Sequence, residues 1–272
     1  MATESKEVRI AKTILLIGLS AVLYGVLGYE PLFRNVCPRA LVLGVVVMFW
    51  PAAIFPAIFG VLFGPLVGGA SAALGIFLSD MLLFHWNLTL YPNVSLGIAI
   101  GVVANFVCFY LISYISRRDP KWTRTRFGYL GLLLSFIILA YVAYLDTRFA
   151  VSIPPPYSSF GVISFGLLFL IVALGKFVWP DWKSYGVAVI TSKAIAGSII
   201  GVGIWGMSQF FVLPLGYFHL PFYISLAWLA WTVSSESLFL LTIMPLVIKV
   251  CYKMFPSLSP HKQEKISKTR NS

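Results

Sequence analysis

Two residues of opposite charge lie inside long apolar segments and are the strongest candidates for chemistry. Lys193 lies in the apolar segment 185–206, and Glu236 lies in the segment 222–250. Ionisable side chains inside a membrane are energetically costly and usually mark a function. At a rise of about 1.5 Å per residue across a hydrocarbon layer of about 30 Å, the two reach similar depths. We expect a buried ion pair, which either fixes the register of two helices or binds substrate and exchanges partners during transport.

Further polar and aromatic side chains could complete a ligand site around this pair. Asp80 lies at the end of the segment 65–84, and Asn105 lies near the middle of the segment 96–115. Trp228 and Trp231 precede Glu236 in the same segment, on a similar helical face. Aromatic faces with a few placed polar groups suit a flat organic ligand, and ordinary core packing is the competing interpretation.

Sequence motifs of enzymes are missing from the chain. It contains no GxxxxGK[ST], HExxH or GxSxG sequence, and its three cysteines and three histidines are widely scattered. Such scattering indicates neither a disulfide framework nor a zinc site. We therefore predict a protein that is not an enzyme, with no catalytic residue, no metal and no cofactor.

The composition indicates an all-α integral membrane protein surrounded by lipid. Of the 272 residues, 59% are hydrophobic and 11% are charged, whereas soluble domains carry about 25% charged residues. The net charge of +11 would suggest a nucleic-acid partner in a soluble protein. Here the basic residues lie almost wholly between the apolar segments, so we interpret them as topology signals and expect no nucleic acid.

The apolar segments predict a helical bundle of about eight transmembrane segments in a single domain, residues 1–256. A basic, disordered tail is expected over residues 257–272. Pro51 and Pro56 leave the second segment open: it is either one kinked helix or an extended piece over residues 40–50 followed by a short helix. The predicted spans are residues 10–29, 40–63, 65–84, 96–115, 127–145, 160–178, 185–206 and 222–250.

The distribution of basic residues predicts that both termini lie on the cytoplasmic side of the cell membrane. With eight spans, nearly all of the 20 Lys and Arg residues fall on the side of the termini. Only Arg34, Arg39 and Arg148 fall in loops on the other side, and Lys193 lies within a span. Cytoplasmic loops carry this excess of Lys and Arg.

One stretch of the sequence resembles a known family. Residues 51–82, PAAIFPAIFGVLFGPLVGGASAALGIFLSDML, contain an apolar run ending in Leu-Phe-Gly-Pro and then a Gly/Ala-rich helix that closes with Asp80. This pattern resembles the substrate-binding membrane subunits, or S components, of energy-coupling factor (ECF) transporters. Ala21 and Gly25 in the first span are similar to that family's AxxxA motif, with Gly in place of the second Ala.

The resemblance implies a substrate-capture subunit that imports a vitamin or related small micronutrient. A transmembrane coupling subunit and ABC ATPases would be its partners, and Ala21, Gly25, Gly64 and Pro65 would contact them. Members of the family usually have six spans, so residues 127–178 would add an extra pair. The alternative is a stand-alone secondary transporter of a small organic solute that uses the Lys193–Glu236 pair.

The ligand is expected on the outer side, between residues 30–39 and the outer halves of the last two spans. Arg39 would meet an anionic group of the ligand, and snorkelling of Arg39 to lipid headgroups is the competing interpretation. Trp228 and Trp231 would stack on the ligand, and Glu236 or Lys193 would close the floor of the site.

Overall fold

The computed structural model describes residues 5–28, 39–42, 45–48, 50–83, 94–117, 133, 137, 182–211 and 219–258. The predicted spans 127–145 and 160–178 lie outside these residues, apart from residues 133 and 137, and so does most of the predicted tail. The described α-helices are α1 (Lys6–Leu27), α3 (Ile54–Phe63), α4 (Pro65–Leu83), α5 (Val94–Ser116), α8 (Trp182–Phe210) and α9 (Tyr223–Met254).

Four of these helices are long and apolar enough to cross a membrane, namely α1, α4, α5 and α8. Helix α9 has 32 residues, and about 20 residues suffice for a span. These helices coincide with the predicted spans 10–29, 65–84, 96–115, 185–206 and 222–250. Helices α1, α5, α8 and α9 extend beyond the prediction at one or both ends, and α4 lies within it. The fold fits a helical membrane protein, and the count of eight spans stays a prediction.

Residues 39–63 do not form one kinked helix, and the extended alternative is confirmed. Strand β1 (Arg39–Val42) pairs antiparallel with β2 (Val45–Met48), with Arg39 opposite Met48. The short 3-10 helix η1 (Pro51–Ala53) then leads into α3. Valine-rich sequence favours extended backbone, and the fixed φ of proline at the start of η1 suits the first turn of a helix. The predicted span 40–63 is therefore a hairpin and a helix of 10 residues.

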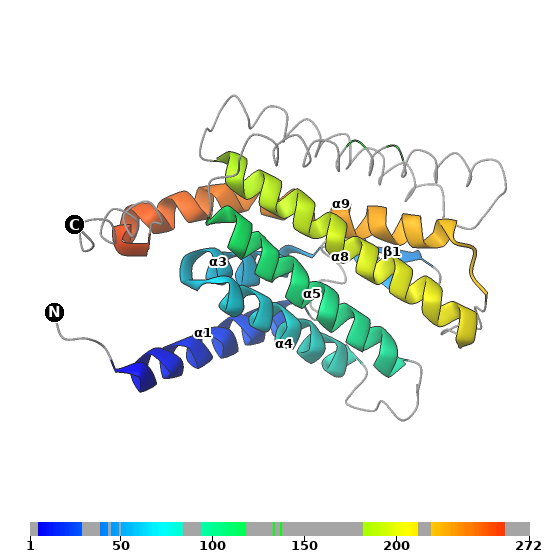
Figure 1. The fold of residues 1–272 in the computed structure, drawn as a ribbon, viewed down its shortest axis with the longest axis horizontal. Helices are drawn as coiled ribbons and strands as arrows, with labels where there is room; N and C mark the ends of the chain where they lie inside the picture. Colours follow the sequence, from blue (N-terminus) through cyan, green and yellow to red (C-terminus); the bar gives the residue numbers. More distant parts are fainter. Residues whose placement is uncertain are drawn as a thin grey trace.

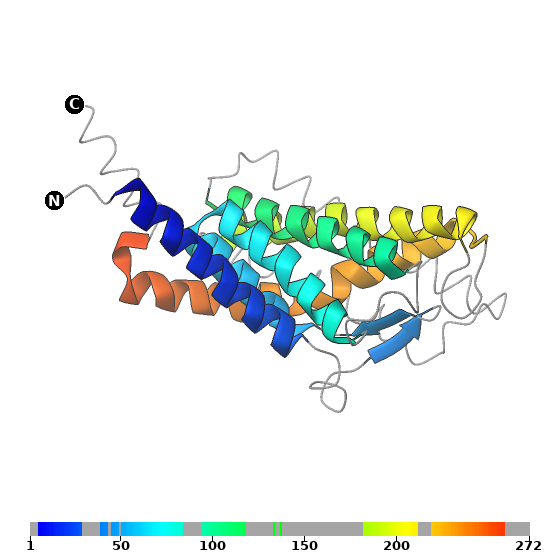
Figure 2. The same cartoon turned by 90° about the horizontal axis from the view of Figure 1, so that it is seen from below.

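The helices run back and forth along one long direction (Figure 1). The start of α1, the turn between α3 and α4, the end of α5, the start of α8 and the end of α9 lie at one end of the bundle (Figures 1 and 2). We call this the basic end, because Lys6, Arg117, Lys249 and Lys253 lie there. The β1–β2 hairpin lies toward the opposite end, the hairpin end (Figure 2).

Small residues allow α4 to pack at the centre of the fold. A Cβ atom added to Gly69 would lie 3.0 Å from the backbone oxygen of Phe106 on α5, and one added to Gly68 would lie 2.9 Å from Gly60 Cα on α3. A larger side chain at either position would push these helices apart. The Gly/Ala-rich stretch therefore serves helix packing, with Ala72 fully buried in the core.

The turn between α3 and α4 depends on one glycine. Gly64 has φ +127° and ψ 165°, a conformation that is essentially restricted to glycine. Arg117 closes the end of α3 by donating hydrogen bonds to the carbonyl oxygens of Val61 and Leu62, at 3.4 and 3.3 Å. These contacts satisfy helix-end carbonyls that have no partner within the helix.

Candidate functional site

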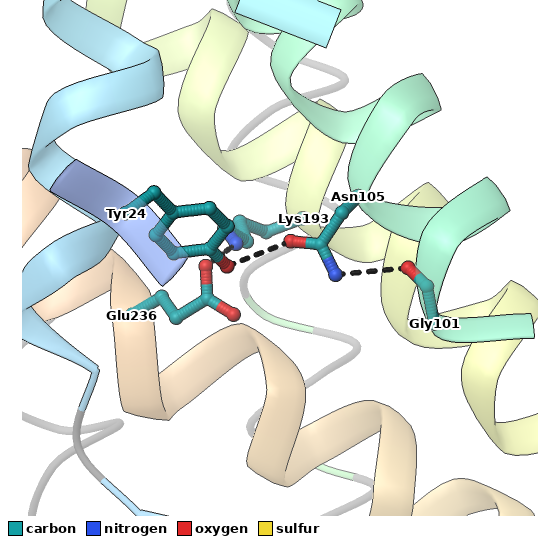
Figure 3. Close-up of polar contacts among 5 residues, drawn as sticks. All are labelled: Tyr24, Gly101, Asn105, Lys193 and Glu236. Atoms are coloured by element: carbon teal, nitrogen blue, oxygen red, sulfur yellow. Dashed lines mark hydrogen bonds and ion pairs between the residues drawn. The ribbon is translucent and has the colours of Figure 1, made fainter. Parts of the chain in front are cut away.

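The structure contains the ion pair that the sequence predicts, between Lys193 on α8 and Glu236 on α9 (Figure 3). The Lys193 side chain is 2% exposed and that of Glu236 is 14% exposed. Both lie well inside their helices, far from either helix end. The pair is thus a buried charge contact in the interior of the bundle.

Two glycines bring the helices of the pair together. Lys193, Gly197 and Gly201 recur every four residues, so they share one face of α8. A Cβ atom at Gly197 would lie 3.0 Å from the carbonyl oxygen of Leu229, and Gly201 lies against the backbone of Ser225. The backbones of α8 and α9 therefore nearly touch along this stripe, and the ion pair forms one turn further along it. The GxxxG spacing is a sequence signal for such contact that our sequence interpretation did not use.

Helix α5 also packs against Lys193. The Lys193 ammonium lies 4.8 Å from the centre of the Phe109 ring, within range of a cation–π interaction. The Cys108 side chain, 1% exposed, lies close to Lys193. Lys193 is thus held from two helices besides its own, α5 and α9.

Helix α1 contributes the fourth side of the cluster through Tyr24. The Tyr24 hydroxyl donates a hydrogen bond of 2.9 Å to Oδ1 of Asn105. The Asn105 amide then donates one of 2.9 Å to the carbonyl oxygen of Gly101. Figure 3 shows the Tyr24 ring, the Lys193 amine and the Glu236 carboxylate pointing toward the same space between the helices. We call Tyr24, Asn105, Cys108, Lys193 and Glu236 the polar cluster.

Tyr24 reaches this position because α1 lies directly on α4. A Cβ atom at Gly25 would lie 2.8 Å from the carbonyl oxygen of Gly75, and one at Gly75 would lie 2.9 Å from that of Ala21. The predicted close approach of another helix to Ala21 and Gly25 is therefore present, but the helix belongs to the same chain. Both residues are buried, which corrects the expectation that they face a partner subunit. Gly64 and Pro65 are half-buried at the turn of the basic end.

The other predicted site residues do not join the polar cluster in the described part of the chain. Asp80 is half-buried on α4, and no hydrogen bond or ion pair connects it to another described residue. Trp228 is 5% exposed, and its indole N–H has no hydrogen-bond partner among the residues that the structure describes. Arg39 is placed only by its backbone in β1, and the side chains of Arg39 and Trp231 lie outside the described residues.

Sequence reasoning missed Tyr24, Cys108 and Phe109. Tyr24 and Phe109 are aromatic residues within apolar helices, where the sequence does not separate a packing role from a polar contact. Cys108 carried no metal or disulfide signal, because no second cysteine lies near it in the sequence. Their place in the cluster follows from tertiary packing alone.

The polar cluster can bind a ligand through charged and hydrogen-bonding groups. It offers one cation, one anion, a phenol, an amide and a thiol within an apolar bundle. Among the described residues, no group of three His, Cys, Asp or Glu side chains could hold a metal ion. Comparison with protein-family models, curated proteins and solved structures finds no match for the chain.

Proposed function

We propose that this protein is the substrate-capture subunit of an ECF-type ABC transporter that imports a vitamin or related small micronutrient. The observation that carries the proposal is the polar cluster, which draws side chains from α1, α5, α8 and α9 into the centre of an apolar bundle. Buried charges in a membrane bundle are costly to maintain, and substrate pathways are their usual reason. A binding site shared by several helices can also change its affinity when those helices move.

A stand-alone secondary transporter of a small organic solute is the second candidate, and the ion pair favours it specifically. A pair such as Lys193–Glu236 can exchange its partner for a substrate or a coupling proton during transport. Pro245 lies inside α9, one of the two helices that carry the pair. Helix α9 nevertheless continues through this proline from Tyr223 to Met254, so the support for this candidate is the ion pair and not a broken helix of the kind found in many secondary transporters.

The test is purification of the full-length protein from its native membrane, followed by native mass spectrometry and protein identification. The proposal expects a retained molecule of vitamin size, together with a membrane coupling protein and ABC ATPases. Uptake of solute by the purified chain alone in liposomes without ATP would overturn the ECF proposal and support the secondary transporter. A Lys193→Met variant should lose the retained molecule, whereas Lys249→Met, the same change at an exposed position, should keep it.

We further propose that the basic end faces the cytoplasm, in the cell membrane. The basic residues at this end are the support for this orientation. In a background without the natural cysteines, Ser5→Cys should react with a membrane-impermeant maleimide only after the cells are opened. His219→Cys, at the hairpin end, should react in intact cells. The reverse pattern would refute the orientation.

A further inference from the structure

The charges of the polar cluster cancel, and this limits the ligands that it can accept. We infer that the cluster binds a small zwitterion, whose carboxylate pairs with Lys193 and whose ammonium pairs with Glu236. The inference rests on the proposed function, because it names the substrate class of the same site.

Charge balance is the first argument. In the described residues, Lys193 and Glu236 supply the cluster's two opposite charges, and Tyr24, Asn105 and Cys108 are neutral neighbours. A ligand with only one charge would pair with one member and leave the other buried and unpaired, which is strongly unfavourable. A neutral ligand could offer hydrogen bonds to the two charges but would supply neither with a counter-charge. A zwitterion satisfies both members when they separate, and the site stays neutral throughout.

The packing around the pair shows which side a ligand could occupy. The glycine stripe of α8 keeps the backbones of α8 and α9 in contact at Gly197 and Gly201. That contact leaves no room for a ligand between these two helices beyond the pair. The polar atoms of Tyr24 and Asn105 lie on the other side of the pair, toward α1 and α5 (Figure 3). A ligand inserted there would meet hydrogen-bonding groups as well as both charges.

The two charged residues differ in how firmly they are held. Lys193 is 2% exposed and also contacts the Phe109 ring and Cys108, so it can keep its place after Glu236 is displaced. Glu236 is 14% exposed, and among the described residues its carboxylate makes no hydrogen bond or ion pair other than the one with Lys193. Glu236 is therefore the member that swings away, and the ligand's carboxylate takes its position beside Lys193.

The first experiment measures binding to the full-length protein in lipid nanodiscs by equilibrium dialysis. The zwitterionic probes are the protein amino acids, β-alanine and γ-aminobutyrate, and the singly charged probes are propionate, butyrate, propylamine and butylamine. We expect at least one zwitterion to bind, with its singly charged analogues about 30-fold or more weaker. Equal binding of an acid or amine, or no binding by any zwitterion, would overturn the inference.

The second experiment uses variants to change the preferred charge of the ligand. Glu236→Gln leaves a cationic site and should prefer butyrate over γ-aminobutyrate, whereas Lys193→Met should prefer butylamine. Each preferred probe should also raise the melting temperature of its own variant, because it supplies the missing charge. The matched controls Glu7→Gln and Lys249→Met, at exposed positions, should keep the preference of the natural protein. A pair with a purely structural role would give no such switch.

The two proposals fail separately. Retention of a micronutrient without a zwitterionic group, together with ATPase partners, would overturn the zwitterion inference and leave the transport proposal standing. Zwitterion binding by a protein that transports without ATPases would overturn the transport proposal and leave the zwitterion inference standing. If both variants fail to fold, the comparison of zwitterions with their singly charged analogues on the natural protein still decides the inference.

Discussion

Removing one partner of the Lys193–Glu236 ion pair leaves the other charge buried in an apolar bundle. Such a change costs about 3–5 kcal/mol of unfolding free energy. The two single variants should differ, because the Lys193 side chain is 2% exposed and that of Glu236 is 14% exposed. Glu236→Gln leaves the more deeply buried Lys193 charge unpaired, so it should destabilise the protein more than Lys193→Met.

The double variant should be more stable than either single one. With Met at position 193 and Gln at position 236, no charge remains unpaired, and neutral residues of similar volume fill the space. Replacing both members of a buried pair is often close to neutral. The coupling free energy between the two substitutions should therefore be at least about 2 kcal/mol, within the range for residues in direct contact.

The assay is equilibrium unfolding in mixed micelles with increasing sodium dodecyl sulfate, followed by tryptophan fluorescence. Lys249→Met and Glu7→Gln make the same chemical changes at exposed positions and should stay within about 0.5 kcal/mol of the natural protein. The reasoning is refuted if the single variants resemble these controls. It is also refuted if the double variant loses the sum of the two single losses.

Four further substitutions should be measurable by the same titration. Tyr24→Phe removes the hydrogen bond to Asn105 and should cost about 1–3 kcal/mol, because the buried amide oxygen loses its donor; no loss would contradict the bond. Gly25→Ala forces a methyl group against the backbone of α4 and should cost about 1–3 kcal/mol. Gly18→Ala on the same helix meets nothing within 4 Å and should be neutral or stabilise by up to about 1 kcal/mol; equal effects of the two would refute the packing argument. Gly64→Ala should cost about 1–3 kcal/mol, because alanine does not readily adopt a φ of +127°, and an unchanged unfolding midpoint would count against this strain.

Hydropathy predicted the long helices because a membrane span must satisfy its backbone hydrogen bonds internally. A long apolar segment without strong breaks therefore has one solution, as in α1, α4, α5, α8 and α9. For residues 40–63 the sequence allowed either one kinked helix or an extended piece followed by a short helix. The valines favour extended backbone and the prolines interrupt a helix, but neither preference says at which residue the extended backbone ends and the helix begins. The structure places it before Pro51, where η1 begins.

The ion pair was predictable from the similar depths of Lys193 and Glu236 in their spans, whereas the rest of the polar cluster was not. Lys193 and Glu236 are the charged residues in the interiors of two neighbouring spans, and each needs a partner. Tyr24 and Asn105 are 81 residues apart in the sequence, and no local pattern indicates that the Tyr24 phenol on α1 reaches α5. Such contacts depend on which helix faces turn toward each other.

The sequence also could not show which helix lies against Ala21 and Gly25. Small residues four apart show that a backbone comes close, but their spacing carries no information about which chain that backbone belongs to. Here it is α4, whose Gly75 fits against both positions. The outward face of α1 instead carries large aliphatic side chains, with Leu15 70% exposed and Leu19 50% exposed. Among the described residues, α4 covers the small-residue face of α1 and leaves this bulky aliphatic face exposed.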